Sequence, residues 1–534
     1  MPTRSAKNFA SILSVLFWKG IGAALSLAAA VGIAHFFGAS GATDAYFVAR
    51  RTISNFASGF ERLLHIMTVP GFVRLVREVG APGLASTLWR LEKRAYLYAG
   101  GACAVAFAFA PMLVVVLAPG MGQEDSATAA LFLRILLVTL PVSIAMGLSG
   151  AVLNAVRSFT LPVIARLSQR AFVVVALVCV PLGADLTAVV VAIVIGTAVM
   201  LVMFKLVMRR ALASMRATGT GLETREPAGH GLAGNRSRQA AIVIAFSYQL
   251  VVGWFDTAVA SFAGVGAIAI FALAQRAVNV GPGMMNDSAI AVFYTEFSES
   301  ALATDKEKFR RLVGDALRAA VYFVLPIATL LFIFGRPLAS ILFGHGAFTG
   351  PAVEQAGALL QIFAVLALLN NVGATLMAAS LADPGLPHFR MILSTVVIAF
   401  LLRALTDWAL IDTYGVLAVA TGAAVSGLGF LGVIFFWLSG RYGQVVDRAN
   451  RLELGKLGLA ALAAGLVAWA GLWALEPLVA GGRMGLIGLV GGLGVVAGLF
   501  YLGVGALLGV QEVAKTRGAL VSLASGLSRQ IRAR

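Results

Sequence analysis

The sequence is poor in charged residues and in the side chains that most often carry covalent or metal chemistry. Only 12% of the 534 residues are charged, whereas 60% are hydrophobic and the mean hydropathy is +0.91. The two cysteines, Cys103 and Cys179, both lie within long apolar segments, which argues against a disulfide or a metal pair. The histidines lack the spacing of metal ligands: His35, His65, His230, His345 and His388. No cofactor or metal is expected, and the N-terminus lacks the pattern of a cleavable signal peptide.

Long apolar runs dominate what is present. Fourteen segments are each long enough to cross a bilayer core of roughly 30 Å as a helix. These segments are 11–38, 44–73, 94–118, 128–155, 158–183, 185–208, 239–262, 266–295, 315–343, 354–382, 388–411, 414–438, 456–478 and 484–509. The sequence therefore predicts an all-α polytopic membrane protein with fourteen transmembrane helices.

Positive charge alternates between the connections. Lys and Arg crowd the N-terminus, every second connection and the tail, and they account for most of the net charge of +17. The intervening connections, such as GASGAT, GMGQEDS and GHGAFTGPAVE, carry neither residue, apart from Arg483. Because cytoplasmic loops are enriched in Lys and Arg, this pattern predicts that both termini are cytoplasmic. Nucleic-acid binding needs cations on one folded surface, and here they flank spans, so no nucleic-acid partner is expected.

The chain contains an internal repeat. Residues 37–51 can be laid over residues 262–276 without a gap, so that Arg51 meets Arg276 at an offset of 225 residues. Each predicted half has six spans, and six is even, so the halves should share one orientation around an axis along the membrane normal. Such halves usually enclose a central cavity that opens to one side at a time.

The repeat divides the chain into six predicted parts. These are a cytoplasmic N-terminus (1–10), an N-lobe (11–208), a cytoplasmic linker (209–238), a C-lobe (239–438), the last two spans (439–510) and a basic cytoplasmic tail (511–534). The last span is rich in glycine, which is typical of either close helix packing or a lipid-facing groove.

Ionisable residues inside the spans are the best indicators of function, because burying charge in a membrane is costly. In the second span, polar residues recur on one helix face: Arg51, Asn55, Ser58 and Arg62, flanked by Arg50, Glu61 and His65. The eighth span carries a similar stripe: Arg276, Asn279, Gly283 and Asp287. In the first span, Lys19 lies roughly 12 Å from the cytoplasmic start.

Arg51 and Arg276 have no obvious partner in their own helices, and they occupy equivalent positions in the repeat. If the pseudo-symmetry holds, the two guanidinium groups face each other across the cavity. Each planar fork can then bind phosphate oxygens of a diphosphate. The alternative is that these arginines form ion pairs that hold the bundle together.

Three further charges lie in the predicted outer half of the membrane. Asp256 is in the seventh span, and Arg403 and Asp407 lie one helical turn apart in the eleventh. If the three converge, the guanidinium neutralises both carboxylates and no external cation is needed. The alternative is that Arg403 pairs with Asp407 alone.

The segment FFGASGATDAYFVARR (36–51) resembles the junction of the first two spans in the MurJ/MviN family of lipid II flippases, members of the MOP exporter superfamily. The resemblance extends to Glu61 and Pro70 at similar spacing, to ALAQR and the Gly-Pro that follows in the eighth span, and to the number of spans. It covers essentially the whole chain.

This resemblance implies a V-shaped bundle of two six-helix lobes with a central cationic cavity, and a lateral groove at the last two helices for a polyprenyl tail. It also implies that Asp44, Arg51, Glu61 and Arg276 lie in or beside the cavity, and that Asp256 stands where some members coordinate a cation. The implied function is translocation of lipid II, an undecaprenyl-diphosphate-linked saccharide, from the inner to the outer leaflet of the bacterial cytoplasmic membrane. The protein would work as a monomer among membrane lipids.

Two stretches depart from the family pattern. The Arg-Asp pair usual in the middle of the first span is replaced by the apolar residues 27–31, with Lys19 as a partial substitute. Arg403 stands near the position where an amide side chain would help to hold sodium. These departures leave open another polyprenyl-linked saccharide, such as an exopolysaccharide or O-antigen unit. They also leave membrane potential, H⁺ and Na⁺ open as driving forces.

Two other function classes are disfavoured. An enzyme acting on such a substrate would need carboxylates or histidines on a sizeable extramembrane loop. The outer loops are short and offer only Glu124, Asp125 and His345. A drug or cation antiporter of the same superfamily would favour an acidic cavity, whereas this cavity is predicted to be basic.

Overall fold

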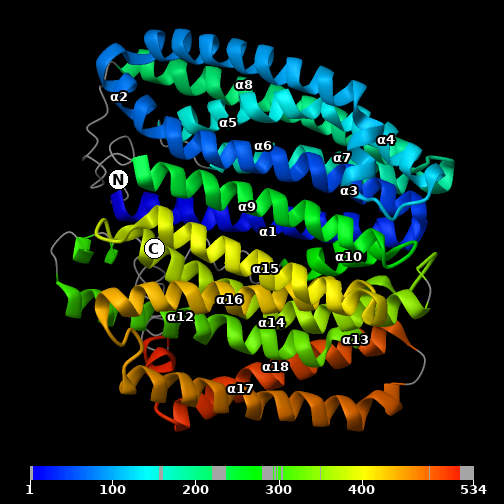
Figure 1. The fold of residues 1–534 in the computed structure, drawn as a ribbon, viewed down its shortest axis with the longest axis vertical. Helices are drawn as coiled ribbons and strands as arrows, with labels where there is room; N and C mark the ends of the chain where they lie inside the picture. Colours follow the sequence, from blue (N-terminus) through cyan, green and yellow to red (C-terminus); the bar gives the residue numbers. More distant parts are fainter. Residues whose placement is uncertain are drawn as a thin grey trace, which may run out of the picture. The chain divides into compact units, whose positions relative to one another are not determined.

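The computed structural model describes residues 4–155, 160–218, 236–279, 293, 296–297, 299–301, 305–348, 350–479 and 482–516. Every regular element within these ranges is a helix, as predicted (Figure 1). The chain divides into two compact units. The first comprises Met1–Arg276, His345–Ala352 and Asp407–Val419, and the second comprises Ala277–Gly344, Val353–Thr406 and Ala420–Arg534.

The first unit holds the helices between residues 1 and 276. They are α1 (Arg4–Phe37), α2 (Gly41–Ala108), α3 (Ala110–Leu117), α4 (Gln123–Leu137), α5 (Thr139–Ala155), α6 (Thr160–Ala165), α7 (Leu167–Val178), η1 (Val180–Leu182), α8 (Leu186–Thr218), α9 (Arg236–Ser261) and most of α10 (Ala267–Asn279).

The second unit holds most of the remaining helices, although α14, α15 and α16 each contribute residues to the first unit as well. They are α12 (Lys306–Ile333), α13 (Gly335–Phe343), α14 (Gly350–Ala382), α15 (His388–Tyr414), α16 (Val416–Tyr442), α17 (Arg448–Leu475), η3 (Glu476–Val479) and α18 (Arg483–Leu507). The division into these units does not test the predicted lobes, which stay a prediction.

Local sequence explains where several helices begin and end. Gly38 follows α1 with φ +63°, a left-handed conformation that glycine adopts at low cost. Ser40 then caps α2, because its hydroxyl accepts a hydrogen bond from the backbone N–H of Thr43. Pro111 lies in the first turn of α3, and the chain bends by 78° between Gly83–Ala108 and α3.

The helix α2 is folded back on itself, so that it supplies two antiparallel limbs to the first unit (Figure 1). A buried core joins the limbs to α5 and α8. It contains Phe72 and Leu84 from the two limbs, Met146 from α5 and Phe204 from α8. The first limb carries half of the predicted site residues, and this core fixes its position within the unit.

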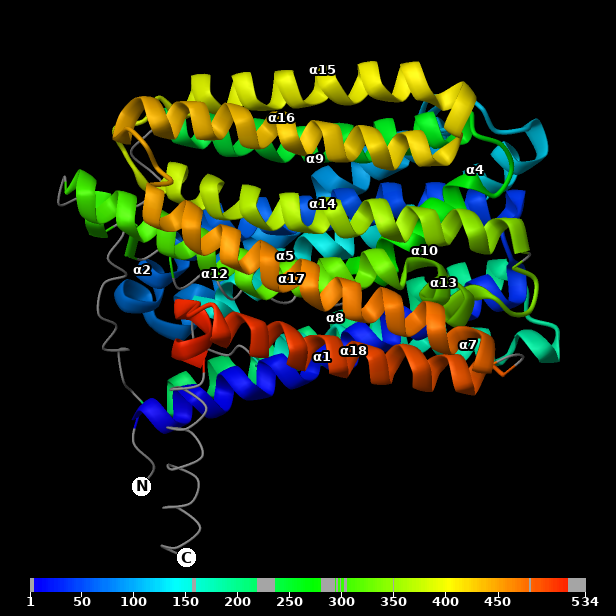
Figure 2. The same ribbon diagram turned by 90° about the horizontal axis from the view of Figure 1, so that it is seen from below.

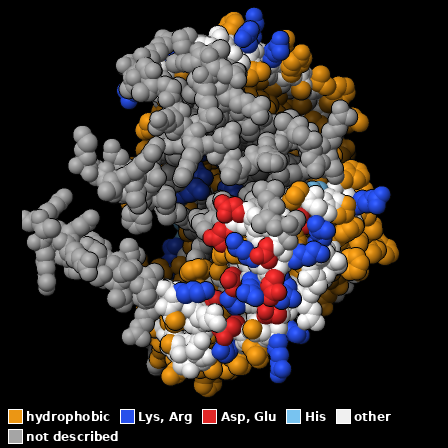
Figure 3. Space-filling view, turned by 90° about the vertical axis from the view of Figure 1, so that its left-hand side faces the viewer, with side chains coloured by type: hydrophobic (Ala, Val, Ile, Leu, Met, Phe, Trp, Pro, Cys, Tyr) orange, Lys and Arg blue, Asp and Glu red, His pale blue; other side chains and the backbone are white. Residues whose placement is uncertain are grey.

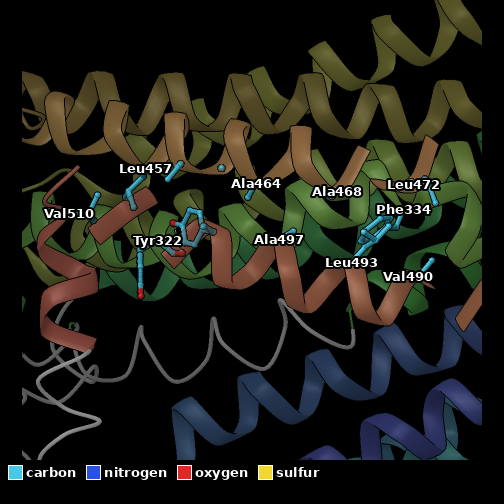
Figure 4. Packing of buried hydrophobic residues seen from close by; sticks show 13 residues of the cluster. Tyr322, Phe334, Leu457, Ala464, Ala468, Leu472, Val490, Leu493, Ala497 and Val510 are labelled. Carbon is cyan, nitrogen blue, oxygen red and sulfur yellow. Dashed lines mark hydrogen bonds between the residues drawn. The ribbon is translucent and has the colours of Figure 1, made fainter. Parts of the chain in front are cut away.

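In the second unit, α17 and α18 lie side by side and pack against α12 (Figures 1 and 2). Figure 4 shows Ala464 and Ala468 of α17 facing Leu493 and Ala497 of α18 in the shared core. Small residues one turn apart let the two backbones approach closely. The hydroxyl of Tyr501 adds a hydrogen bond of 3.1 Å to the carbonyl oxygen of Tyr322.

Most glycines of α18 lie outside this packing. A Cβ added at any of several of them would meet no atom within 4 Å: Gly488, Gly491, Gly492, Gly494, Gly498 and Gly503. For these residues the close-packing interpretation is wrong, because no atom of the described residues lies beside them. The neighbouring side chains of Val495, Val496 and Leu499 are exposed, so this part of α18 is apolar and is not covered by the described part of the chain.

Eleven described helices are long and apolar enough to cross a membrane, and the bent pair would make twelve. The two remaining predicted spans are the second and the eighth. The first limb of α2 is interrupted by the charges predicted to line a cavity, and only the apolar start of the eighth span, Ala267–Asn279, is described. The multi-pass helical architecture is confirmed, whereas the number fourteen stays a prediction.

Candidate functional site

The first unit brings Arg51 of α2 and Asp256 of α9 together. The Nη2 atom of Arg51 lies 3.0 Å from Oδ2 of Asp256, and the two side chains are 14% and 4% exposed. The Arg51 guanidinium also lies over the ring of Phe271, 5.2 Å from its centroid. The ion-pair alternative therefore holds for Arg51, with a partner in another helix.

Arg276 of α10 makes the reciprocal contact. Its guanidinium lies 5.1 Å from the ring centroid of Phe47. Each of the two repeat-equivalent arginines thus stacks on an aromatic ring of the helix that carries the other. This exchange is what a local two-fold relation between the start of α2 and α10 would produce.

Asp44 fastens the first turn of α2 to the first turn of α10. Its carboxylate is 4% exposed and accepts hydrogen bonds from the N–H groups of Gly266, at 2.6 Å, and Ala269, at 2.7 Å. A helix N-terminus has unpaired N–H groups and a positive partial charge, so a carboxylate is well suited there. Gly266 has φ +85°, and a Cβ on it would lie 2.7 Å from the carbonyl oxygen of Ala39, so only glycine fits this approach.

Other connections that were predicted to face outward gather at the same end of the first unit. The N–H of Gly120 donates to the hydroxyl of Ser261 at 2.9 Å, and the N–H of Ala347 donates to the carbonyl oxygen of His35 at 2.8 Å. The rings of His35 and His345 lie 4.9 Å apart. These contacts agree with the predicted alternation of connections, while the side of the membrane stays a prediction.

Glu61 has a partner that sequence reasoning missed. Arg166, between α6 and α7, contacts both carboxylate oxygens of Glu61, and Nη1 lies 3.0 Å from Oε2. Arg170 lies one turn further along α7 and was missed as well. Both arginines lie inside the predicted span 158–183, so the rule that singled out Arg51 would have found them.

A second missed group is a closed ion pair in the core of the first unit. Glu92 of α2 is buried and accepts a hydrogen bond of 2.7 Å from the hydroxyl of Ser149 on α5. Its other carboxylate oxygen contacts Nζ of Lys205 on α8. Because both oxygens are bonded, this group serves to join three helices.

The remaining predicted site residues are more scattered. On α2, Arg50 and Asn55 are partly buried, and a Cβ on Gly253 would lie 2.6 Å from Nδ2 of Asn55. Lys19 on α1 and Asn279 at the end of α10 are exposed. The side chain of Arg62 lies outside the described part of the chain, as do Gly283 and Asp287.

The predicted convergence of Asp256, Arg403 and Asp407 stays a prediction. Arg403 and Asp407 are 6% and 0% exposed on α15, but they fall in different compact units. Asp256 contacts Arg51 of α2. Among the described residues, no three His, Cys, Asp or Glu side chains are placed to hold a metal ion.

Known proteins resemble the chain in sequence. The model of the family described as lipid II flippase MurJ matches residues 33–481. A probable lipid II flippase MurJ of Buchnera aphidicola is 28% identical over 109 residues, which are 20% of this chain and 21% of that protein. A probable lipid II flippase MurJ of Bdellovibrio bacteriovorus is 29% identical over 112 residues, 21% of each chain. The matched stretch thus spans about a fifth of the length of these curated relatives.

Solved structures resemble the fold. A lipid II flippase MurJ in an inward closed conformation has a TM-score of 0.71 at 17% identity, covering 92% of this chain and 98% of that one. An inward-facing multidrug resistance MATE family transporter of the MOP superfamily has a TM-score of 0.63 at 14% identity, covering 79% and 95%. These likenesses confirm the predicted MOP-type fold. Since the family model spans most of the sequence, the chain belongs to the lipid II flippase MurJ family.

Proposed function

We propose that the protein translocates an undecaprenyl-diphosphate-linked saccharide, lipid II, from the inner to the outer leaflet of the bacterial cytoplasmic membrane by alternating access. A member of a flippase family with the MOP fold is a transporter rather than an enzyme. The substrate and the direction of transport form the proposal.

The observation that carries the proposal is the excess of arginine at membrane depth in the first unit. The arginines in question all lie within predicted spans of the first unit: Arg50, Arg51, Arg166, Arg170 and Arg276. Asp256 and Glu61 neutralise two of them. An excess of guanidinium groups is costly in a membrane unless an anion binds there, and a diphosphate suits such forks.

Arg51 and Arg276 would hold the diphosphate, and Asp44 would control access. The hydrogen bonds that Asp44 accepts from the N–H groups of Gly266 and Ala269 join segments that the repeat assigns to opposite lobes. If these segments separate when the outer side opens, the first turn of α10 loses its carboxylate and must regain it on closure. The apolar, uncovered face of α18 suits the polyprenyl tail.

The pairing of Arg51 with Asp256 bears on coupling. A guanidinium 3.0 Å from the carboxylate supplies the positive charge that a bound cation would otherwise provide. Transport would therefore need no sodium, and the membrane potential or protons would drive it.

Complementation tests the proposal. The full chain should restore growth to a bacterium depleted of its own lipid II flippase, and Arg51→Ala and Arg276→Ala should each fail while folded protein accumulates in the membrane. Arg134→Ala is the matched control, because Arg134 is bonded to the carbonyl oxygen of Phe107 at the surface of the first unit. Growth with both site variants would contradict the diphosphate clamp. No growth with wild type, although it folds, would point to another lipid-linked saccharide.

Cysteine labelling tests the orientation. Cysteines introduced at Gln123 and Thr349 should react with an impermeant maleimide added to intact cells, whereas cysteines at Ser214 and Asp305 should not. The reverse pattern would overturn the proposed direction of export.

A further inference from the structure

Two histidines from distant parts of the chain meet at the end of the first unit that is predicted to face outward. His35 lies in the last turn of α1, and His345 lies in the connection between α13 and α14. Their ring centroids are 4.9 Å apart, and the ring planes make an angle of 80°. The repeat assigns these two segments to opposite lobes, although both belong to the first compact unit. The pair therefore joins segments that alternating access would separate.

A hydrogen bond and two glycines hold the backbones of these segments together. The carbonyl groups in the last turn of a helix lack partners within the helix, and that of His35 accepts a hydrogen bond of 2.8 Å from the N–H of Ala347. Gly346 has φ +70°, and a Cβ on it would overlap the carbonyl oxygen and Nδ1 of His35. Gly38 has φ +63°, and a Cβ on it would overlap the carbonyl oxygen of Ala347. Each segment thus presents a glycine where it meets the other.

The contact suits neutral imidazoles and opposes charged ones. The Nδ1 atom of His35 is buried and has no hydrogen-bond partner among the described residues. A neutral imidazole can leave Nδ1 without a hydrogen, whereas an imidazolium carries hydrogens on both nitrogens. Protonation of His35 would therefore bury a donor without an acceptor. If His345 is protonated as well, two positive charges face each other across the 4.9 Å between the rings.

The charged groups around His35 do not compensate a positive charge on its ring. The helix α1 packs against α2, α6 and α7. No charged residue lies on α6, and the charged residue of α7, Arg170, lies beside Gly22 in the other half of α1. At this end of the unit, Asp44 of α2 is bonded to N–H groups of α10, and Asp125 lies at the start of α4. Neither carboxylate forms an ion pair or hydrogen bond with His35.

The charged groups on the helices next to His345 are also engaged elsewhere or exposed. Arg336 lies on α13, and Arg483 of α18 donates a hydrogen bond of 2.8 Å to the carbonyl oxygen of Ile341 on α13. Glu354 lies on α14, and its side chain is exposed. None of these three charged side chains forms an ion pair with His345. Positive charge on the two rings thus has no counter-charge from these helices.

We propose that His35 and His345 form a proton-sensitive latch on the outer side of the transporter. While the imidazoles are neutral, the rings pack and the two segments stay joined. When the imidazoles are protonated, the contact is lost and the outer side opens. Histidine suits this role because its charge ordinarily changes between pH 5 and pH 8. The inference rests on the proposed function for alternating access and for the outward orientation, and it adds that acid outside the cell favours opening.

Double electron–electron resonance between two spin labels measures the opening. Labels at Gln123 and Pro351 occupy exposed positions, one in each predicted lobe, and Cys103→Ser and Cys179→Ser remove the native thiols. Between pH 8 and pH 5, the ratio of open to closed molecules should rise roughly tenfold, as expected when one buried donor is left without an acceptor. The measurement needs no lipid substrate, so it reports on the latch alone.

Histidine variants test whether the two rings carry this response. His35→Phe and His345→Phe each keep an aromatic ring at the contact and cannot take up a proton there. Each should stay closed at pH 8 and lose most of the opening at pH 5. His230→Phe, in the predicted cytoplasmic linker, is the control and should respond as the otherwise unchanged labelled chain does.

The glycines provide a test that does not involve protonation. Gly346→Ala should raise the open population at both pH values, because the added Cβ would overlap His35. Gly183→Ala is the matched control: Gly183 is also left-handed, with φ +99°, but a Cβ on it meets no atom within 4 Å. The control carries the same kind of backbone strain without the overlap, and its distances should not change. Equal effects of the two variants would show that this contact does not hold the outer side closed.

The outcomes separate the latch from the proposed function. Opening in acid that is lost in both histidine variants supports the latch. Distances that do not change with pH, or histidine variants that open as fully as the unchanged chain, would overturn the latch and leave the proposed function standing. A working latch in a protein that does not move lipid II in proteoliposomes would contradict the proposed substrate and leave the latch standing.

Discussion

The two compact units differ in the acceptors that surround some of their buried or partly buried arginines. In the second unit, Arg318 of α12 is 7% exposed and is enclosed by acceptors from three segments. Its Nε lies 3.1 Å from Oε1 of Glu512, and its other nitrogens contact Asn450 and Asp315. In the first unit, Arg50 and Arg170 are partly buried without such acceptors among the described residues.

A buried carboxylate of the second unit is likewise held by donors. Asp383, after α14, accepts hydrogen bonds from Arg441 at 3.2 Å, Tyr442 at 2.7 Å and the N–H of Gly385 at 2.8 Å. Further ion pairs lie at the starts of α12 and α17, and Figure 3 shows acidic and basic side chains mixed on the end of the molecule at the left of Figure 1. Charged side chains that stabilise the fold are paired with opposite charges of the protein. Charged side chains without such a partner are candidates for binding a charged ligand.

Breaking the Arg318 cluster should have the largest effect on folding. Arg318→Met leaves the Glu512 carboxylate buried without its cation, which costs about 3–5 kcal/mol of unfolding free energy. Thermal unfolding of the detergent-solubilised protein would measure this loss. Arg311→Ala is the control, because its pair with Glu307 is fully exposed on the same helix and should contribute little. Equal stability of the two variants would contradict the contrast between the units.

Removing the Asp44 carboxylate should have an intermediate effect. Asp44→Ala leaves the N–H groups of Gly266 and Ala269 without their acceptor, at a cost of about 1–3 kcal/mol. Hydrogen exchange should show faster exchange in the first turn of α10, with Asp44→Asn between wild type and Asp44→Ala. Unchanged exchange there would show that the contact does not hold α10.

The sodium response tests how far the protein supplies its own counter-charges. Wild-type transport should be the same in sodium and in choline buffer, because Arg51 already neutralises Asp256. If Arg403 neutralises the carboxylates of Asp256 and Asp407, transport by Arg403→Asn should become sodium-stimulated or strongly pH-dependent. If Arg403 only pairs with Asp407, the variant should lose stability and gain no ion dependence. Sodium dependence already present in wild type would refute the built-in counter-charge.

The smallest effect is expected at an exposed helix cap. Asp185 accepts a hydrogen bond of 2.9 Å from the N–H of Ala188, and this bond lowers the pKa of the carboxyl. Asp185→Ala should cost roughly 0.5–1 kcal/mol at neutral pH. Because the folded-state pKa is depressed, the contribution is present above the unfolded pKa near 3.9 and is lost as pH falls through the lower folded value. A difference between variant and wild type that persisted below that pH would contradict the capping explanation.

Sequence reasoning predicted the helical membrane fold and the repeat-equivalent pair Arg51 and Arg276, because apolar length and a shared motif are local signals. It could not predict the ion pair of Arg51 with Asp256, which are 205 residues apart in the chain. Tertiary packing alone decides such a contact. The contact of the Arg170 guanidinium with Gly22 could not be predicted from the sequence either. Glycine occurs on apolar helices for several reasons, and only the close approach of α1 and α7 shows that this one leaves room for an arginine.

Translocation of fluorescent lipid II in proteoliposomes tests the central claim most directly. Wild-type protein should make the labelled lipid accessible to a quencher on the opposite side, and the rate should fall at least about tenfold in Arg276→Ala, the loss expected for one charge-assisted phosphate contact. Arg134→Ala should behave as wild type. Equal rates for wild type, Arg276→Ala and protein-free vesicles would contradict the claim that the arginines of the first unit carry a diphosphate-linked lipid across the membrane.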